Sequence, residues 1–350
     1  MFEFKVDGAL DIGSSGIKLA LCKNKRIDKV DFVDYIDMEE EKIISLQGSL
    51  EILTGKVNLK GKNLIVTIPA SKFHVKTLEY NNHREEGEEI NLDARIEEDL
   101  EDIISGYTKD EFITQVETIY ETDIYRKLLV ITIPAEEIEK ILGVLTQFKI
   151  RALKIIPDFI ALNNLVELLD QKSEEETEES VMIVDIGAET SKMFMSTLGT
   201  LNILRMVGIG GNDFTEIIKD HQMLNSESAE LEKQNLELGD DENREYKTQG
   251  EMLMFKDLTS VVHELTTQIE NSVEYFNSNL VEGKISKIFL TGGGALIKGF
   301  KTYFDNAFEI PCEEIELNLL NLDYRNKEDE ELLSTFKITT LMGALTKEVG

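Results

Sequence analysis

Hydrophobic and polar positions follow two distinct periods along this chain, and together they predict a mixed α/β protein. Short apolar runs bounded by turn residues predict strands at residues 63–69, 73–80, 112–120, 127–134, 151–156, 181–185 and 285–290. Apolar residues at helical spacing predict helices at about 39–53, 88–104, 135–148 and 158–169. The strongest helical pattern lies between Leu258 and Leu280, and a last helix is expected at about 333–347.

Two segments of the chain repeat one another. Residues 10–21 are LDIGSSGIKLAL and residues 184–195 are VDIGAETSKMFM, so the copies start 184 − 10 = 174 residues apart. Each copy is an apolar strand, a small polar turn and a second apolar strand, which predicts a β-hairpin. Its tip offers backbone N–H and hydroxyl donors, which bind anions. The repeat therefore predicts two related lobes, each with an anion-binding hairpin.

Two further glycine-rich turns accompany the hairpins. Residues 291–300, TGGGALIKGF, follow a predicted strand and lead into a helix. Residues 208–215, GIGGNDFT, lead into a helix expected at 213–220 and offer another turn for a phosphate. Two hairpins and a later glycine turn predict a nucleotide held between the lobes.

Length and charge limit the class of protein. A chain of 350 residues is long enough to divide into two lobes, and 41% hydrophobic residues support packed cores. The 37 basic and 68 acidic residues give a net charge of −31. A field of that sign repels phosphate backbones and anionic lipid headgroups, so nucleic acid and direct membrane binding are excluded. A basic peptide partner and a purely solubilising role both fit the charge.

The cysteines and the apolar segments point to one compartment. Cys22 and Cys312 are the only cysteines and lack metal-ligand spacing, which fits a reducing environment. The first residues lack the apolar core of a signal peptide, and no run approaches the ~18 apolar residues of a spanning helix. We expect a cytoplasmic protein that is peripheral at the inner membrane only through a partner.

The chain is expected to divide into two lobes. The first lobe covers residues 1–170 and contains a compact unit of its own at about 72–152. An acidic run at residues 170–180 closes it, and the second lobe covers residues 181–350. Within the second lobe, residues 224–250 are polar and acidic, which predicts an exposed and mobile segment.

Asp11 and Asp185 occupy the same place in the two hairpins. Two carboxylates converging on a triphosphate are suited to hold Mg²⁺ through its waters, so both are the predicted metal residues. One Asp before a Gly is more often only a turn former, whereas the pair together with the glycine turn favours the functional interpretation. Lys18 either adds positive charge at the phosphates or points outward from its strand. The predicted nucleotide-binding residues of the hairpins are Asp11, Gly13, Ser14, Ser15, Gly16, Lys18, Asp185, Gly187, Ala188, Glu189 and Thr190.

No catalytic residue is predicted. The four histidines are scattered, and no Ser/His/Asp order or metal spacing links them. Glu189 is an unusual neighbour for a phosphate, which argues against efficient hydrolysis. We expect ATP binding with weak or no ATPase activity.

The motifs together resemble the actin-like ATPase superfamily, which includes actin, Hsp70 and sugar kinases. Within it the sequence is most similar to the PilM family of type IV pilus assembly, a relative of FtsA. The resemblance covers nearly the whole chain. It is carried by residues 10–18, 184–190, 210–215, 229–233 and 290–299.

The resemblance implies an actin-like ATPase fold of duplicated ribonuclease H-like lobes. It also implies a small α+β subdomain inserted in the first half, where the unit at about 72–152 lies. ATP with Mg²⁺ would occupy the cleft between the lobes, with Lys233 and the Gly292 turn near the adenosine. The nucleotide-binding residues that this implies in addition are Gly210, Gly211, Lys233, Gly292, Gly293, Gly294 and Ala295.

The resemblance further implies a partner, the N-terminal cytoplasmic tail of a PilN-like inner-membrane protein, bound in a groove beside the inserted subdomain; self-association also fits the family. We expect a scaffold in which ATP closes the lobes and the closed form binds the tail. One alternative is an FtsA-like division protein that polymerises on the membrane, although the chain ends without the basic amphipathic helix of that family. Another is a small-molecule kinase, which needs a general-base Asp, and no candidate stands out beyond Asp185.

Overall fold

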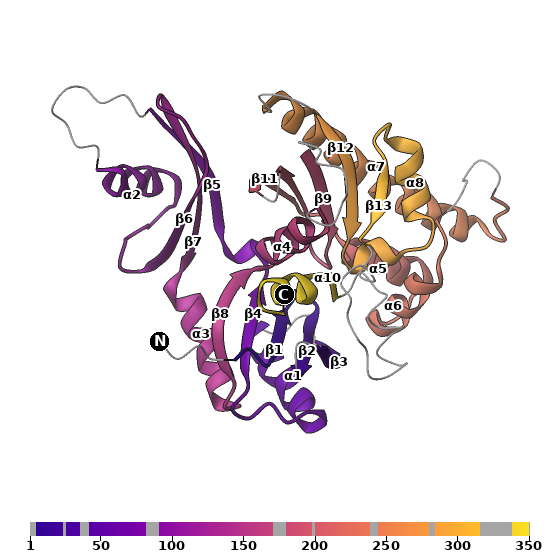
Figure 1. Cartoon of the computed structure of the whole chain (residues 1–350). Helices are drawn as coiled ribbons and strands as arrows, with labels where there is room; N and C mark the ends of the chain where they lie inside the picture. Colours follow the sequence, from indigo (N-terminus) through magenta and orange to yellow (C-terminus); the bar gives the residue numbers. More distant parts are fainter. Residues whose placement is uncertain are drawn as a thin grey trace.

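Three β-sheets organise the protein. The computed structural model describes residues 5–23, 26–35, 42–81, 91–170, 180–197, 200–238, 244–279, 284–315 and 338–349. Within them lie two five-stranded sheets and one three-stranded sheet (Figure 1). The three-stranded sheet stands to one side at the upper left of the view, above the first five-stranded sheet, and the second five-stranded sheet lies at the upper right.

The first sheet is built around the first repeated segment. Its order is β3-β2-β1-β4-β8, with antiparallel β3-β2-β1 and parallel β1-β4-β8 pairings. The strands are β1 (Gly8–Ile12), β2 (Gly16–Lys23), β3 (Arg26–Asp34), β4 (Asn63–Ile68) and β8 (Arg151–Pro157). The predicted hairpin of residues 10–21 is therefore the β1–β2 pair.

The second sheet has the same plan. Its order is β11-β10-β9-β12-β13, again with an antiparallel three-strand meander beside parallel strands. The strands are β9 (Ser180–Ile186), β10 (Ser191–Thr197), β11 (Thr200–Val207), β12 (Ile285–Thr291) and β13 (Cys312–Glu314). The second repeated segment is the β9–β10 hairpin, so the duplication predicted from sequence extends to the topology of both sheets.

Helices cover the sheets, and α4 lies between them (Figure 1). Phe159 and Leu162 of α4 share one hydrophobic core with Ile183 of β9 and Phe194 of β10, which joins the two halves. Fully buried aromatic and aliphatic side chains give such a core most of its stability. The helices are α1 (Lys42–Lys56), α3 (Ala135–Gln147), α4 (Asp158–Asp170), α5 (Gly211–Gln222), α6 (Ser226–Asn235), α7 (Gln249–Asn279), α8 (Phe300–Ala307) and α10 (Thr339–Val349), with short 3₁₀ turns η1 (Ala70–Lys72) and η2 (Gly293–Leu296).

The third sheet lies within the unit expected at about 72–152. Strands β5 (His74–Asn81), β7 (Tyr125–Pro134) and β6 (Phe112–Glu121) pair antiparallel in the order β5-β7-β6. The helix α2 (Leu92–Ile103) covers one face, where Leu100 packs with Leu128 and Val130. β8, the last strand of the expected unit, pairs with β4 in the first sheet. The boundaries of the lobes and of the inserted unit remain predictions.

One segment differs from its prediction. Residues 224–250 were expected to be exposed and mobile, yet α6 occupies residues 226–235 and buries Ala229 and Lys233. Leu236 and Leu238 after it are also buried against the second core. The few apolar residues here pack against α5 and the second core, which the acidic average composition conceals. Residues 239–243, the acidic loop at 171–179 and the start of the last predicted helix lie outside the described residues.

The last helix returns to the first sheet. α10 packs on α4 and on β1, and its Leu341, Met342 and Leu345 join Ala161 and Leu165 in one core. Although it belongs to residues counted with the second lobe, it closes the first. No helix among the described residues is long and apolar enough to cross a membrane.

Close helix packing at Gly343 yields a stability prediction. A Cβ at Gly343 would lie 1.9 Å from the carbonyl oxygen of Ala161, so α10 and α4 would have to separate. We expect Gly343→Ala to lower the free energy of unfolding by about 2 kcal/mol, measured by urea denaturation. Gly48→Ala is the matched control, because a Cβ at this α1 glycine meets nothing within 4 Å. The control should gain roughly 0.5–1 kcal/mol, and equal effects of both changes would contradict the packing argument.

Candidate functional site

The tip of the β1–β2 hairpin is held by one tyrosine. The Gly13 N–H donates to the Gly16 carbonyl at 2.8 Å, which closes the turn over Ser14 and Ser15. The Tyr35 N–H donates to the Ser15 carbonyl at 2.9 Å, and the Tyr35 hydroxyl donates to the Gly13 carbonyl at 3.2 Å. Tyr35 was not among the predicted residues. The two hydrogen bonds of Tyr35 hold the predicted turn residues at 13–16 in one ordered loop.

Asp11 carries an ion pair within this hairpin. It is 4% exposed and lies opposite Lys18 in the antiparallel register. The Lys18 ammonium lies 2.8 Å from Asp11 Oδ2, and the Thr67 hydroxyl of β4 donates to Asp11 Oδ1 at 2.7 Å. Lys18 therefore points toward Asp11 rather than outward from its strand, and its role at a phosphate stays a prediction.

The second hairpin reproduces this pair and extends it. Asp185 lies opposite Lys192 in register, and the Gly187 N–H donates to the Thr190 carbonyl at 3.0 Å to close the tip. The Lys192 ammonium lies 2.5 Å from Asp185 Oδ2 and 2.5 Å from Asp158 Oδ2. Burial lowers the pKa of Lys192, but the charges of Asp158 and then Asp185 outweigh burial, and the pKa rises above its usual value. Lys192 is therefore a buried cation.

Sequence reasoning missed Lys192 and Asp158. Asp158 follows β8 of the first sheet and begins α4, and its Oδ1 accepts the Ala70 N–H at 3.0 Å. The signal for Lys192 was present, because it stands seven residues after Asp185, as Lys18 stands seven after Asp11. For Asp158 there was none, since only the fold brings the end of β8 to β10.

The two hairpin tips lie near one another. The charge of Asp185 contributes to the raised pKa of Lys18, after burial, which lowers that pKa, and Asp11, which raises it. Burial and then the charges of Asp11 and Glu189 raise the pKa of Tyr35. Residues of both repeats thus share one electrostatic environment. Their approach was expected from the duplication.

The start of α5 rests on the second hairpin tip. The Gly211 N–H donates to the Gly187 carbonyl at 2.9 Å, and the Asn212 N–H donates to the Ala188 carbonyl at 2.8 Å. A Cβ at Gly210 would lie 2.5 Å from the Ala188 carbonyl oxygen, so a side chain has no room there. The predicted residues at 187–188 and 210–211 are therefore one contiguous structure.

Lys233 joins α6 to the same region. Its ammonium, on a side chain that is 8% exposed, donates to the Gly211 carbonyl at 3.1 Å and to the Thr215 hydroxyl at 2.8 Å. It also pairs with Glu230 at 2.5 Å. These contacts hold α6 against the start of α5, so Lys233 supports the turn with its charge already paired.

The Gly292 turn lies against Asp185. Gly292 has φ of +91° and ψ of 158°, a backbone conformation essentially restricted to glycine. Its missing side chain leaves space for Asp185 Oδ1 and the Ile186 carbonyl, each 2.4 Å from where a Cβ would stand. The Ala295 N–H donates to the Gly292 carbonyl at 3.1 Å, which continues the turn into η2. Gly294 packs on Ile186, whereas a Cβ at Gly293 would meet nothing within 4 Å.

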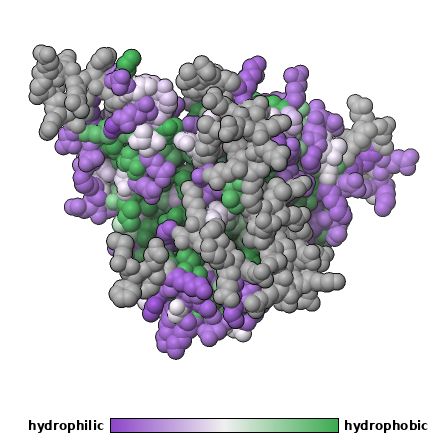
Figure 2. Space-filling view, viewed as in Figure 1, coloured by the Kyte–Doolittle hydropathy of each residue, from purple (hydrophilic) through white to green (hydrophobic). Residues whose placement is uncertain are grey.

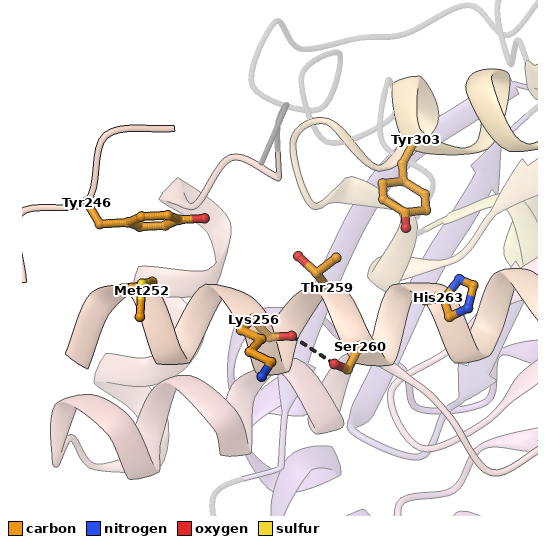
Figure 3. A pocket seen from close by; sticks show the side chains of 7 residues that line it. All are labelled: Tyr246, Met252, Lys256, Thr259, Ser260, His263 and Tyr303. Carbon is orange, nitrogen blue, oxygen red and sulfur yellow. Dashed lines mark hydrogen bonds between the residues drawn. The ribbon is translucent and has the colours of Figure 1, made fainter. Parts of the chain in front are cut away.

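A separate pocket lies along α7. Its volume is about 390 Å³. Figure 3 shows Tyr246 at one end of the pocket and Tyr303 at the other, both above α7. The dashed bond runs from the Ser260 hydroxyl to the Lys256 carbonyl at 2.9 Å. None of the predicted site residues lines this pocket; its lining residues are Tyr246, Met252, Lys256, Thr259, Ser260, His263 and Tyr303.

A family model identifies the protein class. The model described as type IV pilus assembly protein PilM matches residues 9–345. The chain belongs to the PilM family. The resemblance noted on the hairpins and the glycine turns is thereby confirmed, and this PilM-family chain is a type IV pilus assembly protein of actin-like fold. No curated protein sequence matches it.

Solved structures show the same fold. A PilM–PilN type IV pilus biogenesis complex matches with a TM-score of 0.79 at 16% identity, covering 99% of this chain and 100% of that one. EutJ of Carboxydothermus hydrogenoformans matches with a TM-score of 0.55 at 11% identity, covering 99% and 91%. MreB5 of Spiroplasma citri, bound to ADP, matches with 0.52 at 13% identity, covering 97% and 94%. The actin-like ATPase fold predicted for this PilM-family chain is confirmed.

The described residues fit one kind of metal site. They include no group of three or more His, Cys, Asp or Glu side chains spaced to hold a metal ion by themselves. Asp11 and Asp185 are nevertheless buried oxygen donors beside the two tips. Mg²⁺ keeps several waters and commonly takes one or two carboxylates with substrate phosphates. In this PilM-family protein the donors fit such a nucleotide-borne ion, and the glycine-containing turns fit its phosphates.

Proposed function

We propose that this PilM-family protein binds ATP with Mg²⁺ between its two five-stranded sheets and acts as a cytoplasmic scaffold of the type IV pilus machinery. One observation carries the proposal. Asp11 and Asp185, the equivalent carboxylates of two repeated hairpins, are buried beside two closed glycine tips, and the Gly292 turn packs directly on Asp185. The ADP-bound MreB5 with the same fold supports a nucleotide as the ligand.

Each part of the site has a role in this proposal. The tips at Gly13–Gly16 and Gly187–Thr190 would bind phosphates through backbone N–H and hydroxyl groups. Asp11 and Asp185 would hold the waters of Mg²⁺, which neutralises phosphate charge when bound. Lys18 would add a positive charge beside the first tip. Gly210, Gly211 and the turn at 292–295 would form the adenosine side, with Lys233 holding it in place.

Slow or absent turnover follows from the same geometry. A kinase needs a general-base Asp, and Asp158 is a further buried carboxylate that the sequence did not reveal. Its two oxygens are occupied, because Oδ2 pairs with Lys192 and Oδ1 accepts the Ala70 N–H. Burial raises the pKa of Asp158 above its usual value, with the charge of Lys192 opposing it, but neither oxygen is free to take a proton from an attacking water. Nucleotide would then act as a conformational ligand that closes the two halves. A sensitive phosphate-release assay should detect no multiple turnover at ATP concentrations where calorimetry shows the nucleotide bound.

We propose as partner the N-terminal cytoplasmic tail of a PilN-like inner-membrane protein. The match to a PilM–PilN type IV pilus biogenesis complex supports a PilN-like partner. The outer strand β6 is a suitable surface, because an extended peptide can pair with it. Ile113 is 49% exposed and Tyr120 46% exposed on this strand. Apolar residues gather over this side of the molecule, toward the left of Figure 2. Ile113 pairs with Ile133, whose side chain belongs to the main core beside the first sheet.

Charge supports the same partner. Cytoplasmic segments that flank membrane helices are rich in Lys and Arg. A net charge of −31 attracts such a tail and raises its rate of association. The membrane would then be reached through the partner, and the tail would dock without the protein touching lipid.

Titration calorimetry tests the proposal in two steps. ATP with Mg²⁺ should bind the wild-type protein with micromolar affinity, and a synthetic N-terminal tail of a PilN-like protein should then bind the loaded protein. We expect Ile113→Glu to weaken the tail at least about tenfold, because it buries a charge in the contact. Leu231→Glu is the control, since Leu231 is 57% exposed on α6, away from β6.

The outcomes separate the parts of the proposal. Absence of ATP binding would remove the nucleotide role, and ATP binding without tail binding would remove the partner. Equal weakening by both Glu variants would mean that added charge alone, rather than the β6 surface, governs tail binding.

A further inference from the structure

Lys192 connects carboxylates from the two halves of the molecule. Its side chain is 8% exposed, and the Asp158 and Asp185 side chains are 9% and 7% exposed. Asp158 follows the first sheet, whereas Asp185 lies in the second. In the first hairpin, by contrast, Lys18 pairs with Asp11 of its own hairpin, and its side chain is 28% exposed. Lys192, the second copy of this lysine, thus joins the two halves of the molecule.

We propose that Lys192 is a tethered counter-cation: its ammonium occupies the position between Asp158 and Asp185 that a divalent cation would otherwise take. Mg²⁺ without nucleotide then binds the wild-type protein poorly, because it must displace an ammonium held by two carboxylates. This inference deepens the proposed nucleotide site and rests on it for its biological use.

Electrostatics supports the assignment. An ammonium 2.5 Å from each of two carboxylates neutralises one of their two charges and leaves one. Removing one partner of a buried ion pair strongly destabilises a protein, because an uncompensated charge stays buried. Two facing carboxylates without Lys192 form a pair of hard oxygen donors with an excess of negative charge. Such donors favour Mg²⁺ or Ca²⁺ over monovalent ions.

The competing explanation is a purely structural salt bridge. Both explanations predict that Lys192→Met lowers the melting temperature. They differ in what restores it. If Lys192 forms only a structural salt bridge, a dissolved cation does not restore the melting temperature of Lys192→Met. If Lys192 acts as a counter-cation, a dissolved divalent cation restores it.

The test measures thermal unfolding of the full-length protein without nucleotide. Unfolding curves are recorded in about 10 mM MgCl₂, a concentration high enough to fill a weak cation site, and in NaCl of equal ionic strength. For the wild type we expect the same melting temperature in both salts. For Lys192→Met we expect a loss of roughly 10 °C in NaCl, of which at least about half returns in MgCl₂.

Two variants control the interpretation. Lys301→Met breaks an exposed pair with Asp305, 2.6 Å apart in α8, and should leave the melting temperature equal in both salts. Asp158→Asn combined with Lys192→Met removes one of the two carboxylates together with the lysine. That double variant should be more stable than Lys192→Met in NaCl and should lose the response to MgCl₂.

Three results would overturn the inference. These are an equal melting temperature of Lys192→Met in both salts, an equal MgCl₂ response of the double variant, and a wild type already stabilised by MgCl₂. Should Lys192→Met fail to fold in NaCl, refolding in MgCl₂ but not NaCl would support the inference, and failure in both would refute it. Because no nucleotide is present, these results are independent of whether ATP binds.

Discussion

Asp11→Asn is expected to weaken binding of ATP with Mg²⁺ about 100-fold, equivalent to about 2.7 kcal/mol. Asparagine keeps the size of the side chain and an oxygen for the Thr67 hydroxyl, so the hairpin should remain folded. It removes the negative charge that pairs with Lys18 and that, in the proposed site, holds the waters of the ion. Titration calorimetry in MgCl₂ measures the loss.

The same variant distinguishes a metal role from a general effect on the site. With EDTA in place of Mg²⁺, the nucleotide carries its full negative charge, and loss of a neighbouring carboxylate should leave its affinity equal or higher. A loss of similar size in EDTA would show that Asp11 supports the fold of the tip rather than a metal.

Asp31→Asn is the matched control for Asp11. Asp31 lies on β3 of the same sheet and also pairs with lysine, 3.3 Å from Lys56, but it stands opposite Leu19 rather than at the hairpin tip. We expect unchanged ATP affinity in both buffers. A change in this variant would attribute the effect to net charge.

Gly292→Ala is expected to lower the melting temperature by roughly 5 °C, which corresponds to about 3–5 kcal/mol for a chain of this size. An alanine would hold a backbone conformation essentially restricted to glycine, at φ of +91°, which costs about 1–3 kcal/mol. Its Cβ would also meet Asp185 Oδ1 and the Ile186 carbonyl at 2.4 Å, so β9 or the turn must move. Differential scanning calorimetry measures the change.

The adjacent glycine provides the comparison. Gly293→Ala places a Cβ where no atom lies within 4 Å, so its melting temperature should stay within about 2 °C of the wild type. If both alanines destabilise equally, the turn is sensitive to any side chain and the contact with Asp185 is not the cause. If neither does, the backbone at Gly292 is not held as described.

The hairpins show which parts of the fold can be predicted from local sequence patterns. The strand, turn and strand of residues 10–21 and 184–195 were predicted from alternation and turn residues alone, because pairing between adjacent strands depends on nearby sequence. The amphipathic pattern of α7 was equally clear, since it buries one face along its whole length. The helix at residues 229–233 was implied by the resemblance but not by composition, because a short polar helix is stabilised by neighbours rather than by its own composition.

The functional residues divide in the same way. Asp11, Asp185 and the glycines could be named from the repeat and the resemblance, as each sits at a turn that its own sequence specifies. Thr67, Tyr35 and Asp158 could not, because each reaches the site from a different element. Their partners are 56, 22 and 88 residues away along the chain.

By itself, the sequence determined the class of the protein through two related hairpins and the glycine turns that accompany them. These features are local or additive, so a linear pattern is enough to specify them. Only the tertiary structure decided that α10 closes the first sheet and that Lys192 links Asp158 to Asp185. Both depend on long-range packing, because the pairing of a buried charge or an apolar helix face is set by whichever distant element the fold places beside it.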